Sequence, residues 1–282
     1  SYTLAGNNFW QSGRSTRPFS IQAGQGIPQF EHFNSDTWPN SEASRSAAWT
    51  VLLSRAYSHP LEAQAAVAML GTRQRSDLLL SALAGAPTLN TPFNADSWLD
   101  NQLRTVARLI SIRQQVGMRR QFFCVEIGGW DTHANHLQQH AERLTELASG
   151  LFSFQRTLQE LGVDQPVTTF SFSEFNRTLT INGDGTDHAW AGDQIVMGGA
   201  VDGGKLHGTP LAYSTQGTGE HWGDTLFGPN DTGAGRFVPT YSMDQYGATL
   251  ARWMGIKGTD IDVIFPNLQN FSLKDLGFMK PA

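Results

Sequence analysis

The chain has 282 residues, of which 39% are apolar and 11% aromatic, and its formal net charge is −5. This composition predicts a folded protein with a sizeable core and argues against intrinsic disorder. Lys and Arg are not clustered, so the sequence shows no electrostatic footprint for nucleic acid. No apolar run approaches the roughly 18–20 residues that a transmembrane helix needs.

The first part of the sequence predicts an irregular start followed by helices. Gly, Pro, Ser and Asn are frequent over residues 1–40, and no hydrophobic period persists there. Residues 41–120 predict a helical region, with helices at 41–58, 61–85 and about 97–116. The apolar face of the third helix is expected to contain Leu99, Leu103, Val106 and Ile110.

From residue 121 onward the pattern changes to alternating strands and helices. "QFFCVEI" (121–127) predicts a buried strand, residues 135–161 a long amphipathic helix, and "PVTTFSF" (166–172) the next strand. Because a long crossover connects the two strands, we expect them to be parallel neighbours in an α/β sheet. The buried stripe of the long helix is expected to contain Leu137, Ala141, Leu144, Ala148 and Leu151.

Two further features complete the expected α/β region, residues 121–282. Glycine-rich loops are expected beyond residue 180, and "SMDQYGATLARWMG" predicts a helix with a capping box from Ser242 to Gln245 and an end at Gly255. The single cysteine, Cys124, lies in an apolar run, which favours a small core residue and excludes an internal disulfide.

Asp131 and His133 directly follow the first predicted strand, in "GGWDTH". If the backbone stays extended, residues i and i+2 point to the same side and Thr132 points away. One carboxylate oxygen and one imidazole nitrogen would then reach a common cation. The alternative is that Asp131 or Thr132 caps the following helix and His133 lies on the surface.

A second candidate pair, Asp187 and His188, lies in "NGDGTDHAWAGD". A glycine-rich backbone could bend both side chains toward one ion, whereas the alternative is a surface turn with an Asp side-chain hydrogen bond. Asn182, Asp184 and Asp187 also offer oxygen ligands for calcium, but the loop lacks the glycine and closing glutamate of an EF-hand. A calcium-stabilised structural module therefore stays open as an interpretation.

Two other polar groups have competing interpretations. His136 and His140 have a possible ligand spacing, yet a solvated helix face is the expected setting for both. Arg177, in "SEFNRT", offers a planar fork for a tetrahedral oxyanion, and Glu174 could orient it or accept a proton. A plain ion pair between Glu174 and Arg177 is the alternative. No GxSxG, P-loop, HExxH or GxGxxG motif is present.

The motif order as a whole resembles a known family. "GGWDTH", "SEFNRT", "NGDGTDHAW", "MGGAV", "FVPTYSMDQYGATLARWMG" and "FPNL" follow one another over about residues 121–278, and "LAGNNFWQSG" near the start is similar to a mid-chain segment of the same family. The sequence resembles domain-of-unknown-function family 1501, within the alkaline-phosphatase-like (sulfatase-like) superfamily.

This resemblance implies a single domain with a three-layer α/β/α fold and a largely parallel sheet. It implies one or two divalent cations (Zn, Mg, Mn or Ca), with Asp131 and His133 at one and Asp187 and His188 at the other. Superfamily catalysis transfers a phosphoryl or sulfuryl group to a Ser, Thr or modified Cys, and Arg177 would steady the equatorial oxygens.

The sequence also departs from the family pattern. Asn176 stands where glycine is usual, and Asp193 and Gln194 stand at two usual histidine positions. Asp193 can still bind a hard cation, so fewer imidazoles would favour Mg, Ca or Mn over Zn. The Asp-x-His spacing is also shorter than the common one.

The nucleophile is not identified in this sequence. Its position and that of a first metal-binding Asp would lie upstream of Ser1, and Thr132 should face away from the ligands. We therefore expect the chain to be the C-terminal part of a longer protein, or to have lost that half of the site.

Two further function hypotheses stand beside the calcium-stabilised module. The first is a secreted or periplasmic metal-dependent hydrolase that acts on small-molecule or glycan phosphate or sulfate esters, with the location implied by the resemblance alone. The second is a catalytically degenerate extracellular binding or structural protein. Oligomeric state and substrate are not predicted by the sequence.

Overall fold

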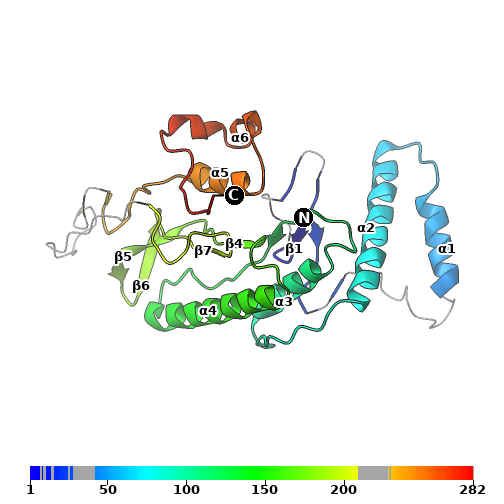
Figure 1. Cartoon of the computed structure of the whole chain (residues 1–282), viewed down its shortest axis with the longest axis horizontal. Coiled ribbons are helices and arrows are strands. Elements are labelled where there is room, and N and C mark those ends of the chain that lie inside the picture. Colours follow the sequence, from blue (N-terminus) through cyan, green and yellow to red (C-terminus); the bar gives the residue numbers. More distant parts are fainter. Residues whose placement is uncertain are drawn as a thin grey trace. The chain divides into compact units, whose positions relative to one another are not determined.

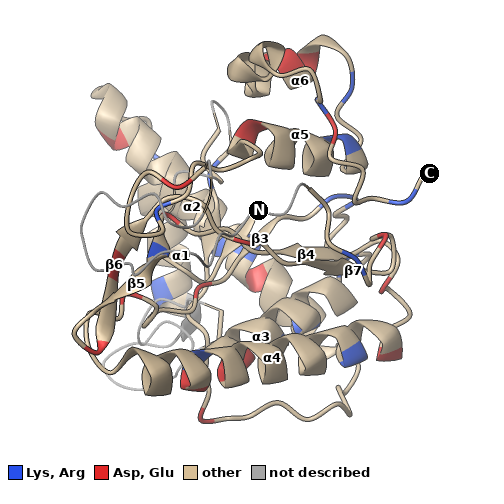
Figure 2. Cartoon of the chain, turned by 90° about the vertical axis from the view of Figure 1, so that its left-hand side faces the viewer, with Lys and Arg blue, Asp and Glu red and all other residues tan. Residues whose placement is uncertain are grey.

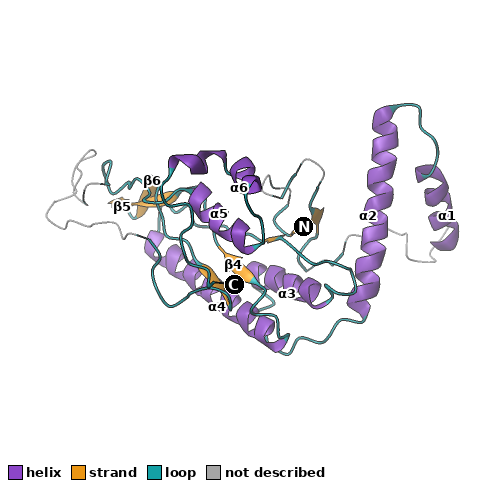
Figure 3. Ribbon diagram, turned by 45° about the horizontal axis from the view of Figure 1, so that its top comes forward, coloured by secondary structure: helices purple, strands orange, loops and turns teal. Residues whose placement is uncertain are grey.

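The computed structural model describes residues 1–6, 8, 11–13, 16–24, 26–27, 42–208, 228 and 230–281. The chain forms two compact units. The first comprises Ser1–Ile127 and Ser149–Thr157, and the second comprises Gly128–Ala148 and Leu158–Ala282. The fold is mixed α/β, with long helices and short strands (Figure 3).

A small parallel sheet lies in the first unit. Its strands are β1 (Tyr2–Thr3), β2 (Phe19–Ser20) and β3 (Phe123–Cys124), in the order β2-β1-β3. The expectation that residues 1–40 are irregular was wrong at β1 and β2, because two-residue strands are too short to show a period of two. Residues 28–41 lie outside the described residues.

Three helices of the first unit confirm the helical prediction (Figure 1). They are α1 (Glu42–Leu53), α2 (Pro60–Ala84) and α3 (Trp98–Ser111). The predicted apolar face of α3 is buried, since Leu99, Leu103, Val106 and Ile110 are each 3% exposed. The helix begins after Ser97, whose side chain accepts a hydrogen bond from the backbone N–H of Asp100, and it ends earlier than predicted.

The core of the first unit joins the sheet to α2 and α3. Tyr2, Ile21, Leu79 and Ile112 belong to one buried cluster, and Phe123 packs against it. Cys124 is half-buried with a free thiol, so it is less enclosed than the core position that the sequence predicted.

The strands of the second unit correct the predicted topology. β4 (Thr168–Phe170) pairs with β7 (Val196–Gly198) in an antiparallel arrangement, and β5 (Asn176–Asn182) pairs with β6 (Gly185–Ala189) in a hairpin. Among the described strands β3 pairs with β1, so the expected parallel pairing of residues 121–127 with 166–172 was wrong. β3 pairs instead with a strand at the start of the chain, a pairing that no local sequence pattern reveals, and the three-layer arrangement with a large parallel sheet is not confirmed.

The long helix α4 (His136–Glu160) was predicted correctly, but its buried face was not. Leu137 is 86% exposed and Leu144 46% exposed, whereas Phe154 and Leu158 are buried. The predicted stripe is largely exposed at the start of the helix, and the buried positions lie in its second half, at Gly150, Phe154, Thr157 and Leu158. Gly150 is buried, and a Cβ there would lie 3.1 Å from Leu99 Cδ2.

The C-terminal part contains α5 (Met243–Trp253), α6 (Thr259–Ile264) and the 3-10 helix η1 (Pro266–Asn270). The capping box of α5 is present as predicted: Gln245 N donates to Ser242 Oγ at 3.2 Å, and Ser242 N donates to Gln245 Oε1 at 2.8 Å. Charged residues of both signs alternate along α4 and α5 (Figure 2). Among the described helices, none combines the length and apolar character needed to cross a bilayer.

Candidate metal site

The first part of the site is the loop between residue 128 and α4. Gly129 has φ of +86°, a conformation that favours glycine, and a Cβ there would lie 3.2 Å from Arg143 Cδ. Thr132 is only 2% exposed, whereas Asp131 and His133 are exposed. Thr132 therefore faces away from its two neighbours, as the period-two argument predicted.

The β5–β6 hairpin lies directly on this loop. Thr186 N donates to Thr132 O at 3.2 Å, and His136 N donates to Asp184 O at 2.9 Å. Gly185 makes the contact so close that a Cβ would lie 2.1 Å from the carbonyl carbon of His133. Only glycine fits at this position without a shift of the backbone. This approach carries His188 of β6 to the loop.

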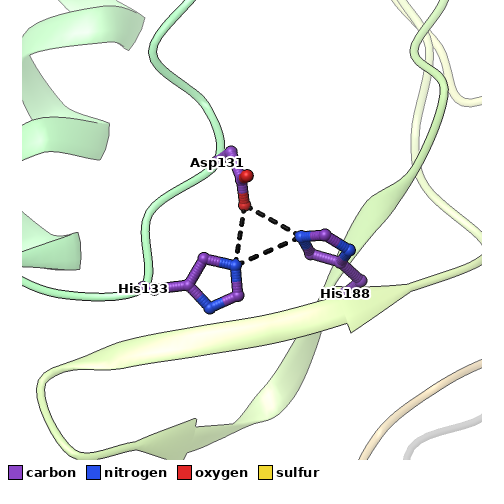
Figure 4. A group of neighbouring side chains, drawn as sticks. All are labelled: Asp131, His133 and His188. Atoms are coloured by element: carbon purple, nitrogen blue, oxygen red, sulfur yellow. Dashed lines mark hydrogen bonds and ion pairs between the residues drawn. The ribbon is translucent and has the colours of Figure 1, made fainter.

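Asp131, His133 and His188 form a compact, exposed group of possible metal ligands (Figure 4). Asp131 and His133 come from the loop and His188 from β6, and their side chains point toward one another. Asp131 Oδ1 lies 3.0 Å from His133 Nε2 and 3.0 Å from His188 Nε2. The two Nε2 atoms are 3.2 Å apart.

These distances fit the spacing of ligands around a cation. Ligands about 2.0–2.1 Å from a metal are about 3.3 Å apart in a tetrahedron and about 2.9 Å apart in an octahedron. The three observed separations of 3.0–3.2 Å lie between these values. Two imidazoles and one carboxylate suit Zn and other first-row metals, and three protein ligands leave positions open.

Arg177 ties the hairpin to Asp131. Its NH1 donates to Asp131 Oδ1 at 2.6 Å, NH2 donates to Thr132 O at 2.9 Å, and Nε donates to Thr186 Oγ1 at 2.9 Å. NH2 also donates to the carbonyl of Thr186. The guanidinium is therefore engaged with the protein, and its ion pair is with Asp131 rather than Glu174.

Electrostatics favour the ionised form of Asp131. A hydrogen bond with His188 holds the pKa of Asp131 below its ordinary value, and Arg177 adds to this effect. Nearby, partial burial lowers the pKa of His136, with His140 and Arg177 contributing. His136 Nδ1 lies 2.6 Å from Thr132 Oγ1 and its ring stacks on His140, so these histidines support the loop rather than face solvent as predicted.

The His188 ring is contacted on its face by Phe175 and at its Nε2 atom by Asp131. Phe175 stacks on it with ring centroids 4.3 Å apart and an angle of 26° between the planes. The guanidinium carbon of Arg177 lies 5.9 Å from the centroid of Phe175. Sequence reasoning missed both Phe175 and Gly185. The Asn-Gly-Asp-Gly run did contain a hairpin signal, but nothing in the sequence marked Phe175.

The other predicted site residues lie outside the three-residue group. Asp193 and Glu174 are exposed, and the structure records no hydrogen bond or ion pair between either of them and another described residue. Asp187 lies on β6 next to His188, and its Oδ1 is 3.9 Å from His133 Nδ1, so it approaches the group without belonging to it. Asn182 Nδ2 donates to Asp187 Oδ1 at 3.0 Å, so two of the three proposed calcium ligands are bonded to each other.

The chain is a mixed α/β protein, and its exposed Asp131, His133 and His188 form a candidate divalent-metal site. Residues 22–221 match the family model described as "Protein of unknown function (DUF1501)", and the chain therefore belongs to this family. The match includes Asp131, His133 and His188, begins after the family-like segment "LAGNNFWQSG" and ends before α5. No curated protein and no solved structure matches the chain.

Proposed function

We propose that this chain is an exported, divalent-metal-dependent hydrolase of phosphate or sulfate esters, related to the alkaline-phosphatase-like superfamily. The observation that carries the proposal is the convergence of Asp131, His133 and His188, whose ligand atoms all lie within 4.8 Å of one another. Export, the superfamily relationship and the class of small-molecule or glycan ester rest only on what the family resemblance of the sequence implies.

The residues of the site suit an anionic substrate. A cation held by this group would polarise a phosphoryl or sulfuryl oxygen and lower the pKa of a water molecule. Arg177 offsets the charge of Asp131, and imidazole ligands are neutral when they bind a metal. The cation's charge would therefore remain largely available to an ester oxyanion. Side chains that are about half exposed, 52–54%, leave the substrate a route of access.

Arg177 has a different role in this proposal from the one that the resemblance implied. Because most of its donors are engaged with Asp131, Thr132 and Thr186, it positions the carboxylate rather than the substrate. Glu174 is exposed in the loop before β5 and is the carboxylate that we propose for proton transfer.

A second candidate is a non-catalytic binding protein that keeps the cation site. It is favoured by Thr132, the hydroxyl between the two loop ligands, which is buried and lies against His136. Thr132 is thus not placed to attack an ester. Asp187 and Asp193, which the resemblance assigned to metal binding, also lie outside the group.

Metal analysis tests the site. Purified wild-type protein should bind about one equivalent of Zn²⁺ or Mn²⁺ in equilibrium dialysis, measured by mass spectrometry of the metal. Asp131→Ala and His188→Ala should each lower the affinity at least tenfold. Asp193→Ala and His207→Ala are matched controls, since both residues are exposed and lie outside the group, and they should bind like wild type.

Hydrolysis of aryl phosphates and aryl sulfates then separates the two candidates. Metal-dependent turnover that is lost in Asp131→Ala supports the hydrolase. Stoichiometric metal without turnover of either ester supports the binding protein. Wild-type protein that binds no Zn²⁺, Mn²⁺, Mg²⁺ or Ca²⁺ would refute both.

A further inference from the structure

We propose that Asp187 is a positioning residue that orients His133 toward the cation without binding the cation itself. This inference rests on the proposed metal site. This role differs from that of a metal ligand, because Asp187 acts on the second nitrogen of the His133 ring rather than on the cation.

The His133 ring lies between two carboxylates. Its Nε2 is 3.0 Å from Asp131 Oδ1, within the ligand group, whereas its Nδ1 is 3.9 Å from Asp187 Oδ1. A neutral imidazole that binds a metal through one nitrogen carries its proton on the other. Asp187 is the carboxylate on that protonated side.

Asp187 is itself held in place. Asn182 Nδ2 donates to its Oδ1 at 3.0 Å, and its backbone N donates to Thr178 Oγ1 at 3.1 Å. Its side chain is 26% exposed, compared with 52% for His133. The first bond holds the carboxylate and the second holds the backbone of Asp187, and both lie within the β5–β6 hairpin. The carboxylate is therefore fixed in position and less exposed than the His133 side chain.

Adjacent residues of β6 thus contact the site in two ways. Because neighbours on a strand point to opposite sides, His188 enters the ligand group while Asp187 lies by the far nitrogen of His133. A single hairpin therefore supplies one ligand and the partner of another ligand. The Asp-His pair keeps its importance without both members touching the cation.

The separation of 3.9 Å is about 1 Å longer than a direct N–H···O bond. A bridging water or a small rotation of the half-exposed His133 ring closes this gap. In either arrangement the Asp187 carboxylate favours the His133 tautomer that carries its proton on Nδ1. That tautomer leaves Nε2 free for the cation, and the interaction raises the basicity of Nε2. Such partners typically change metal affinity by about 10–100-fold.

The test compares wild type with Asp187→Asn and Asp187→Ala, using Asp193→Ala as the matched control. Zn²⁺ affinity is measured by competition with a chromophoric chelator, and the coordination sphere is followed by the visible spectrum of the Co²⁺-loaded protein. We expect Asp187→Ala to weaken Zn²⁺ binding about 10–100-fold with an unchanged Co²⁺ spectrum. The isosteric Asp187→Asn should fall between Asp187→Ala and wild type.

A second measurement uses the Zn²⁺-loaded protein, in which Nε2 of His133 faces the cation and Nδ1 carries the proton. In long-range ¹H–¹⁵N spectra the Nδ1–H proton of His133 should exchange slowly with water in the wild type and faster in Asp187→Ala. Unchanged Zn²⁺ affinity and unchanged proton exchange in Asp187→Ala would overturn the proposal. Loss of binding with an altered Co²⁺ spectrum would also overturn it, because Asp187 would then be a ligand.

These outcomes are distinguishable from failure of the proposed function. If the wild type binds no metal and Asp131→Ala changes nothing, the metal site is refuted. If the wild type binds Zn²⁺, Asp131→Ala abolishes binding and Asp187→Ala changes neither affinity nor proton exchange, only the role of Asp187 is refuted. If Asp187→Ala fails to fold, Asp187→Asn and the wild-type spectra decide the question.

Discussion

Gly185→Ala tests how the hairpin is held against the loop that carries Asp131 and His133. A Cβ at this position would lie 2.1 Å from the carbonyl carbon of His133 and 2.2 Å from its oxygen, whereas ordinary contacts begin near 3.4 Å. The two backbones must therefore separate by about 1.3 Å. Both contacts are to backbone atoms, so no side-chain rotation relieves them.

The expected cost follows from this displacement. Overpacking of this kind costs about 1–3 kcal/mol, and weakening of the Thr186 N–H bond to Thr132 O adds about 0.5–1.5 kcal/mol. We expect Gly185→Ala to lower the free energy of unfolding by about 1.5–4.5 kcal/mol. A shift of His133 by about 1 Å exceeds the tolerance of roughly 0.2 Å on a metal–ligand distance, so Zn²⁺ affinity should fall at least tenfold.

Urea denaturation and Zn²⁺ titration measure the two effects. Gly203→Ala is the matched control, because a Cβ there meets nothing within 4 Å and its φ is not positive. It should change stability by less than about 0.5 kcal/mol and leave Zn²⁺ binding intact. The reasoning is refuted if the two variants unfold at the same urea concentration and bind Zn²⁺ equally.

Three other substitutions test the supports of the site. Arg177→Lys should lower the free energy of unfolding by about 1.5–3 kcal/mol and weaken Zn²⁺ binding, because one ammonium cannot reach Asp131 and the backbone carbonyls together. Unchanged Zn²⁺ binding would mean that Arg177 does not position Asp131 and would favour a role in substrate binding. Phe175→Leu should weaken Zn²⁺ binding by up to about tenfold through loss of the stack on His188, seen by the same titration. Because burial lowers the pKa of His136 from 6.5, the stability that its neutral form contributes is complete above pH 6.5 and is lost as the pH falls toward the lowered value. Urea midpoints from pH 8 to pH 5 should therefore fall more steeply for wild type than for His136→Gln, and parallel curves would contradict the assignment.

The helices could be predicted because each one carries a signal over many residues. The face of α3 repeats over four turns, and the capping box of α5 is contained in four consecutive residues. The strands were predicted less accurately than the helices, because β1, β2 and β3 are each only two residues long. A strand of that length leaves no periodicity, and its partner is chosen by packing between distant segments.

The orientation of α4 shows a different limit. The hydrophobic pattern selected Leu137 and Leu144 for the core, yet His136 and His140 are the more enclosed residues at that end. Polar side chains can be enclosed when their hydrogen bonds are satisfied, as His136 is by Thr132. A pattern that counts only apolar residues misses this.

The sequence nominated Asp131, His133 and His188 as metal ligands, and the three lie together in the structure, but the sequence did not show which contacts bring them together. Asp131 and His133 share a side because they are two residues apart in extended backbone, which the sequence shows. Arg177 contacts Asp131 across 46 positions, and His188 does so across 57. Those contacts depend on where the hairpin lies, which is fixed by the close approach at Gly185.

Hydrogen bonds within the chain hold the hairpin and the loop of the site together. Thr132 O accepts from both Thr186 N and Arg177 NH2, and these bonds join the hairpin to the loop from the buried side. The ligand atoms of Asp131, His133 and His188 lie on the exposed side of the same junction. The bonds to Thr132 O leave the ligand atoms free, whereas the bond from Arg177 to Asp131 Oδ1 uses one of them. Bonds that position the ligands without occupying them reduce the ordering that cation binding has to impose on the chain.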